Sequence, residues 1–158
     1  MMSNYLTVLE ESLMKKNAIL DSIQEASRKQ NELLKCEKLD LERFDELVEE
    51  KDGYLKELEK LDEGFEILYD KVKQELLENK AVYAEQIKRM QQLISQITEK
   101  SVSIQAQESR NRDMVTAYFK NERKALGQGR KSSKVAYGYY QNLNKANQEA
   151  SRIMDLKQ

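Results

Sequence analysis

Residues 41–78, LERFDELVEEKDGYLKELEKLDEGFEILYDKVKQELLE, decide the fold class. Apolar side chains recur in this stretch every three or four residues, and charged side chains fill most positions between them. This spacing places one apolar face on an α-helix. Gly53 and Gly64 each weaken a helix by up to about 1 kcal/mol relative to alanine, but no proline ends it. The stretch predicts one long amphipathic helix that begins after Asp40, a favourable N-cap residue.

The same period continues on both sides of this helix. Residues 6–34 keep a three-four spacing of leucine and isoleucine, and residues 82–119 do so again. Three polar residues occupy core-facing positions of the first of these stretches: Lys16, Ser27 and Gln30. Polar side chains at such positions weaken helix pairing and can set its register. We therefore expect only moderate stability for the pairing of the first helix.

The boundary between the second and third helices has two candidates, Asn79 and Gly64. Asn79 is preferred because it gives three helices of similar length that can pack side by side. The predicted fold is all-α: an elongated, coiled-coil-like antiparallel bundle of three long helices with a flexible C-terminal tail. We expect residues 1–126 to form this bundle, and residues 127–158 to form a glycine- and serine-containing linker followed by an amphipathic tail.

Composition argues against an enzyme, a cofactor or a metal site. The chain has no histidine, which is the commonest general base and metal ligand, and a single cysteine. Cys36 cannot form an internal disulfide, and we expect it to be a small core residue. No apolar run reaches the length of a membrane span, and the start has no signal-peptide pattern. These observations favour a cytoplasmic protein without membrane insertion.

Charge is distributed unevenly although the net charge is only −1. Residues 37–78 carry 16 acidic and 7 basic side chains, whereas residues 110–158 carry 4 acidic and 11 basic ones. Such asymmetry points to an interaction tail. Basic and aromatic residues alternate in that tail, as in single-strand nucleic-acid binders. The chain as a whole is slightly acidic, so a protein partner is expected and nucleic acid is not.

Two groups of apolar residues are candidates for contact with that partner. The first is a band near the end of the third helix that is wider than a helix seam needs: Met114, Val115, Tyr118 and Phe119. The second lies in the tail: Tyr137, Tyr139, Tyr140 and Leu143. Exposed apolar surface beside a flexible segment is typical of a protein-binding site.

Three stretches of the chain resemble a known protein family. Residues 39–72, LDLERFDELVEEKDGYLKELEKLDEGFEILYDKV, resemble the second-helix pattern of the FlgN-type flagellar export chaperones. Residues 90–119, MQQLISQITEKSVSIQAQESRNRDMVTAYF, resemble its third helix, and residues 137–158, YGYYQNLNKANQEASRIMDLKQ, are similar to its tyrosine-rich tails. Many members of the family carry an Asn-x-x-Asn-Gly element in their third helix. Of this element, only Asn111 is present in this chain.

The resemblance implies a cytoplasmic, non-enzymatic chaperone without cofactors. Such a chaperone binds the C-terminal helices of flagellar hook-associated proteins at the hook–filament junction. It prevents their premature assembly and delivers them to a component of the type III export apparatus. A FliT-type flagellar chaperone and a structural coiled-coil scaffold are the alternatives. The identity of the client stays open. The oligomeric state also stays open, with a weak homodimer among the options. A third open question is whether the tail binds the client or docks on the bundle itself.

Overall fold

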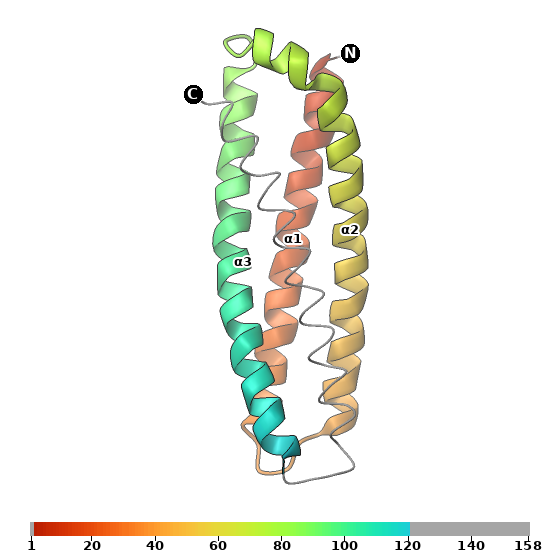
Figure 1. The fold of residues 1–158 in the computed structure, drawn as a ribbon, viewed down its shortest axis with the longest axis vertical. Helices are drawn as coiled ribbons and strands as arrows, with labels where there is room; N and C mark the ends of the chain where they lie inside the picture. Colours follow the sequence, from red (N-terminus) through yellow and green to blue (C-terminus); the bar gives the residue numbers. More distant parts are fainter. Residues whose placement is uncertain (1, 121–158) are drawn as a thin grey trace.

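The computed structural model of the chain describes residues 2–120, with side chains from residue 4 onward. Three helices make up this part of the chain: α1 (Met2–Leu34), α2 (Leu41–Glu78) and α3 (Ala84–Phe119). They form an elongated bundle, and no strand occurs among these residues (Figure 1). The predicted all-α bundle of three long helices is confirmed. At about 1.5 Å per residue, α1 alone is about 50 Å long.

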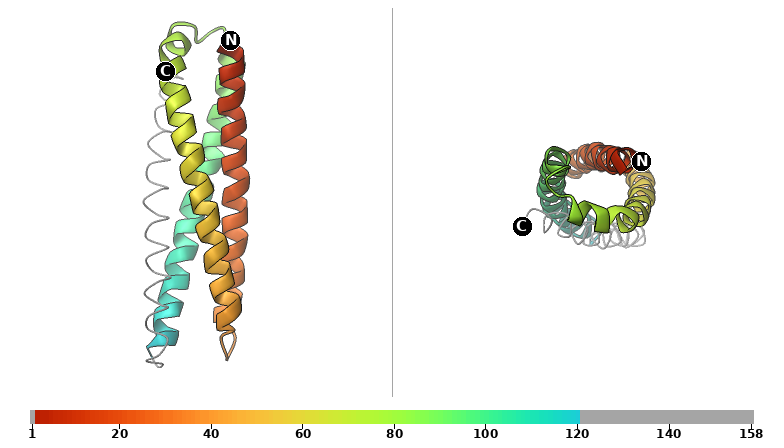
Figure 2. Two further views of the ribbon diagram at one scale, coloured as in Figure 1. Left: turned by 90° about the vertical axis from the view of Figure 1, so that its right-hand side faces the viewer. Right: turned by 90° about the horizontal axis from the view of Figure 1, so that it is seen from above.

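Helix α1 lies between α2 and α3 and packs along both of them (Figures 1 and 2). Consecutive helices run antiparallel, so α1 and α3 run in the same direction. The upper end of the bundle in Figure 1 holds the N-terminus and the α2–α3 connection, and the last turns of α2 bend across it. The lower end holds the α1–α2 connection and the last turn of α3.

The boundaries of α2 follow from local hydrogen bonds. Asp40 is its N-cap, because the side-chain Oδ1 accepts a hydrogen bond from the Arg43 backbone N–H at 3.1 Å. At the other end the Asn79 backbone N–H donates to the carbonyl of Glu75 at 3.1 Å. The Asn79 side chain donates to the same carbonyl at 2.8 Å. The boundary predicted at Asn79 is therefore correct, and Gly64 lies inside the helix.

The expectation for Cys36 is wrong. Its side chain is exposed in the connection between α1 and α2. The connection spans only residues 35–40, and its single buried side chain is Leu39, so the thiol points outward. The predicted end of the first helix near residue 34 is correct. The prediction that the third helix continues to residue 126 extends past the described residues.

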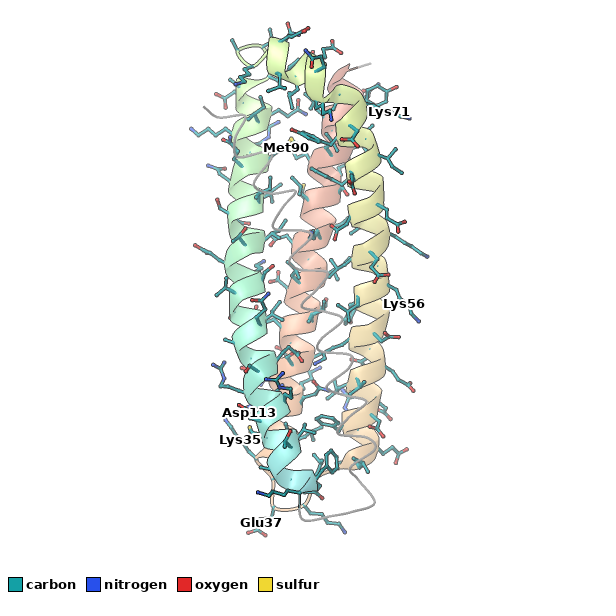
Figure 3. The ribbon with its side chains drawn as sticks, viewed as in Figure 1. Lys35, Glu37, Lys56, Lys71, Met90 and Asp113 are labelled. Atoms are coloured by element: carbon teal, nitrogen blue, oxygen red, sulfur yellow. The ribbon has the colours of Figure 1, made fainter. Side chains whose placement is uncertain are left out.

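Each helix contributes one core-facing seam with a seven-residue repeat. Along α2 the buried residues Phe44 and Phe65 lie three repeats apart, and so do Leu55 and Leu76. Helices α1 and α3 show the same pattern. Figure 3 shows Met90 between the helices, whereas Lys56 and Lys71 point away from the bundle. Two apolar clusters result. The upper cluster contains sixteen buried residues from all three helices, and the lower cluster contains five: Leu39, Phe44, Val48, Val115 and Phe119.

The two interfaces of α1 differ in chemistry beside the seam. Toward α3, polar side chains pair at a constant offset of 79 residues, as in Asn17–Gln96 at 3.1 Å and Glu10–Arg89 at 2.6 Å. Toward α2, the positions beside the seam are apolar, as Ile19 of α1 and Leu61 of α2 illustrate. Beside the seam, polar pairs therefore align α1 with α3, whereas apolar burial joins α1 to α2.

Replacing Gly64 with alanine should stabilise the bundle. The residue is exposed within α2, and an added Cβ has no atom within 4 Å. Alanine also restricts the unfolded chain, so Gly64→Ala should raise the free energy of unfolding by about 0.5–1 kcal/mol in urea titration. Gly53→Ala, with the same open surroundings, should give a similar gain. A loss of stability in both variants would contradict the helical assignment of α2 across the glycines.

Removing the N-cap should destabilise α2 measurably. Asp40→Ala deletes the acceptor of the Arg43 backbone N–H and should lower the unfolding free energy by about 1 kcal/mol. Asp40→Asn is the matched control, because asparagine keeps an acceptor oxygen at the same place and should keep most of the stability. Equal losses in the two variants would indicate that the cap hydrogen bond contributes nothing.

Candidate protein-binding site

The apolar band expected near the end of α3 is half inside the core. Val115 is 2% exposed and Phe119 is 1% exposed. Both belong to the lower cluster with Leu39, Phe44 and Val48. The expectation that these two residues form exposed surface is therefore wrong. The physical reason is that the α1–α2 connection brings Leu39 and the start of α2 against this end of α3.

The other two residues of the band are half-buried. Met114 is held by α1, because its Sδ accepts a hydrogen bond from Asn31 Nδ2 at 3.4 Å. The Tyr118 ring stands edge-on to the Phe119 ring, with centroids 5.2 Å apart. Of these two residues, Tyr118 packs against the lower cluster. The tail candidates lie outside the described residues: Tyr137, Tyr139, Tyr140 and Leu143.

Above the lower cluster, a layer of buried polar side chains crosses the bundle. Lys51 of α2 is 7% exposed and Glu108 of α3 is 5% exposed, and Lys51 Nζ lies 2.5 Å from Glu108 Oε1. Helix α1 supplies Gln30, whose Oε1 accepts from Lys51 Nζ at 2.6 Å, and Ser27, whose hydroxyl donates to Glu108. Lys51 Nζ also lies 3.4 Å from Ser27 Oγ, so each of its three N–H donors has an acceptor.

Asn111 extends this layer by one helical turn. Its Nδ2 donates to the backbone carbonyl of Ser27 at 2.9 Å, which ties α3 to the main chain of α1. Its Oδ1 accepts from Asn31 Nδ2 at 3.1 Å and from Gln107 Nε2 at 2.9 Å. We call Ser27, Gln30, Lys51, Glu108 and Asn111 the polar layer. All three helices contribute to it, and hydrogen bonds join Lys51 to Ser27, Gln30 and Glu108 and join Asn111 to the Ser27 carbonyl.

Burial shifts the pKa values in the two ion pairs that involve the core-facing lysines Lys51 and Lys16. Burial lowers the pKa of the Lys51 ammonium below its usual range, and the Glu108 carboxylate opposes that shift. Nearer the upper end, Lys16 Nζ of α1 lies 2.6 Å from Asp62 Oδ1 of α2. Burial raises the pKa of the Asp62 carboxyl, and Lys16 opposes the shift. The polar core-facing residues predicted in the first helix thus have polar partners on other helices.

A surface pocket of about 450 Å³ lies between α1 and α2. Its lining combines three apolar and three charged residues: Ala18, Ile19, Leu61, Lys15, Glu57 and Lys60. On the same helix faces, two turns before Lys15 and two turns after Lys60, stand two exposed apolar side chains: Val8 and Ile67. The pocket is therefore part of a longer stripe with apolar and charged character. The sequence signal for it is the extra apolar residue beside each seam, Ile19 and Leu61.

Neither a metal-binding cluster nor a membrane-spanning helix occurs among residues 2–120. Within residues 2–120, no group of three His, Cys, Asp or Glu side chains is placed to hold a metal ion. None of the three described helices has a stretch apolar enough to cross a bilayer. No family model matches the sequence, and no curated protein or solved structure is significantly similar to it.

Breaking the buried ion pair should cost far more than breaking a surface pair. Glu108→Ala leaves the Lys51 ammonium buried without its counter-charge, so the unfolding free energy should fall by about 3–5 kcal/mol. The control is Lys56→Ala, which breaks an exposed pair with Asp52 at 3.2 Å and should cost less than about 1 kcal/mol. Urea titration measures both. Similar losses would contradict the buried position of the pair.

Proposed function

We propose that the chain is a cytoplasmic export chaperone of the FlgN type. It binds the C-terminal helices of flagellar hook–filament junction proteins, prevents their premature assembly and delivers them to the flagellar type III export apparatus. Its activity is binding, without catalysis or a cofactor. The proposal combines the sequence resemblance over α2, α3 and the tail with the three-helix architecture.

The observation that carries the proposal is the pocket between α1 and α2. Ile19 and Leu61 are half-buried and offer an apolar floor between two helices, where the side chains of a third helix can insert. An amphipathic helix presents apolar residues at positions i, i+3 or i+4, and i+7. Such a helix lying along the α1–α2 stripe would bury these residues against the floor.

Charges at the rim provide orientation. Lys15 and Lys60 stand on opposite helices, and Glu57 lies one turn before Lys60. A client helix with carboxylates on both sides of its apolar face can pair with the two lysines. Exposed pairs of this kind are individually weak, so they would select the orientation while the apolar contact supplies the affinity.

The length of the bundle supports the same function. Val8 and Ile67 extend apolar surface beyond the pocket, along helices of 33 and 38 residues. A terminal helix of a secreted protein can therefore be covered over several turns. Helices that assemble with each other in a filament expose apolar faces before assembly, and covering them prevents aggregation.

Ala18→Arg should weaken client binding. Ala18 is exposed and lines the pocket, so arginine keeps the helix propensity of α1 but places a long charged side chain over the apolar floor. Calorimetric titration of the full chain with synthetic C-terminal helices of hook–filament junction proteins should give one peptide per chain, with at least about tenfold weaker binding for the variant.

The matched control is Ala106→Arg, the same substitution at an exposed alanine of α3. It should leave the affinity unchanged. No binding of junction-protein helices by the native chain would contradict the proposed function. Equal weakening by both variants would reject the pocket as the site. Stable self-association without peptide binding would favour the coiled-coil scaffold.

A further inference from the structure

We propose that the lower end of the bundle opens as a separate unit while the upper part stays folded, with the polar layer as the boundary. The unit comprises the lower cluster, the connection at residues 35–40 and the helix turns that carry them. This inference does not depend on the proposed function.

The apolar core of the bundle is divided into two clusters. The upper and lower clusters are separate, and the polar layer occupies the seam positions between them on all three helices, where the buried apolar residues Ala26 and Leu47 belong to neither cluster. Helix α3 has two consecutive core-facing polar residues, Glu108 and Asn111, and α1 has Ser27 and Gln30 at the same level. Apolar packing, which makes helix bundles unfold cooperatively, is therefore interrupted at one level of the bundle.

Separating the helices at the polar layer costs less free energy than separating them within the upper cluster. When the layer separates, water can replace the hydrogen bonds of Ser27, Gln30 and Asn111, so the net loss per bond is small. Lys51 and Glu108 recover their hydration as their mutual attraction is lost. Separation within the upper cluster instead exposes apolar side chains with no such compensation.

The two apolar clusters differ in size. Among residues 2–120 the lower cluster has five buried residues and the upper cluster sixteen, so much less of this apolar surface is exposed when the lower end opens. The lower end also contains the exposed connection between α1 and α2. Opening there would uncover Phe44, Val115 and Phe119, which makes the apolar band of α3 available to a partner only in the open form.

Native-state hydrogen exchange of the full chain tests the proposal. Amides near the lower ends of α2 and α3, around Phe44 and Val115, should exchange at least about tenfold faster than amides around Leu76 and Ile87. The comparison is fair because all four sites lie within about two turns of a helix end. Equal rates at the two ends of the bundle would overturn the proposal.

A pair of double variants tests the role of the polar layer. Lys51→Met with Glu108→Leu replaces the buried pair with apolar side chains and should reduce the tenfold difference to less than about threefold. The control, Lys16→Met with Asp62→Leu, removes a partly buried pair whose helices are joined within the upper cluster and should leave the difference unchanged. A difference that persists in the first double variant, or disappears in the control, would overturn the layer's assignment as the boundary.

Cys36 provides a second readout that needs no substitution. It is the single cysteine of the chain and is exposed at the lower end, so an environment-sensitive fluorophore can be attached there. In urea, the fluorescence transition should come at a lower concentration than the loss of helical circular dichroism. Coincident transitions in the native chain would overturn the proposal. This measurement decides the matter even if the double variants do not fold.

Discussion

The ion pair between Lys51 and Glu108 is the interaction on which the arrangement of the three helices depends. It joins α2 directly to α3, two helices that pack mainly against α1 rather than against each other. Ser27 and Gln30 of α1 complete the hydrogen bonding of the pair, so the charges are satisfied only when all three helices are in register. A slip of one helix by a turn would leave a buried charge unpaired, which costs several kcal/mol. The polar layer therefore sacrifices some stability for a defined alignment.

The two sides of α1 differ in the contacts that they make with α3 and α2. Its polar pairs with α3 keep a constant offset of 79 residues, and directional hydrogen bonds of this kind hold two parallel helices in one register. Its contact with α2 contains the Lys16–Asp62 ion pair and the Lys51 hydrogen bonds, but beside the seam it is apolar and leaves a pocket lined by Ile19 and Leu61. One side of α1 thus determines the geometry of the bundle, and the other carries the pocket at which we propose that a client helix binds. This division of roles is what a binding protein with a rigid scaffold requires.

Much of the fold could be predicted from the sequence because the signals are local. The apolar period, the Asp40 cap and the Asn79 break depend on neighbours within a few residues, and the structure confirms all three. The exposure of Cys36 and the burial of Val115 and Phe119 could not be predicted, because they depend on where the α1–α2 connection folds. Lys51 and Glu108 occupy core-facing positions in the sequence pattern, but only the alignment of α2 with α3 shows that they meet. The pocket likewise needs the pairing of α1 with α2.

A double-mutant cycle on Lys51 and Glu108 tests the central claim most directly. The unfolding free energies of the native chain, Lys51→Met, Glu108→Leu and the double variant are measured in urea under the same conditions. If the pair aligns the helices, each single substitution leaves one buried charge unpaired, and the double variant is more stable than either single one. The account predicts a coupling energy of at least about 2 kcal/mol. Additive losses, with a coupling energy near zero, would show that the two charges do not depend on each other and would contradict the account.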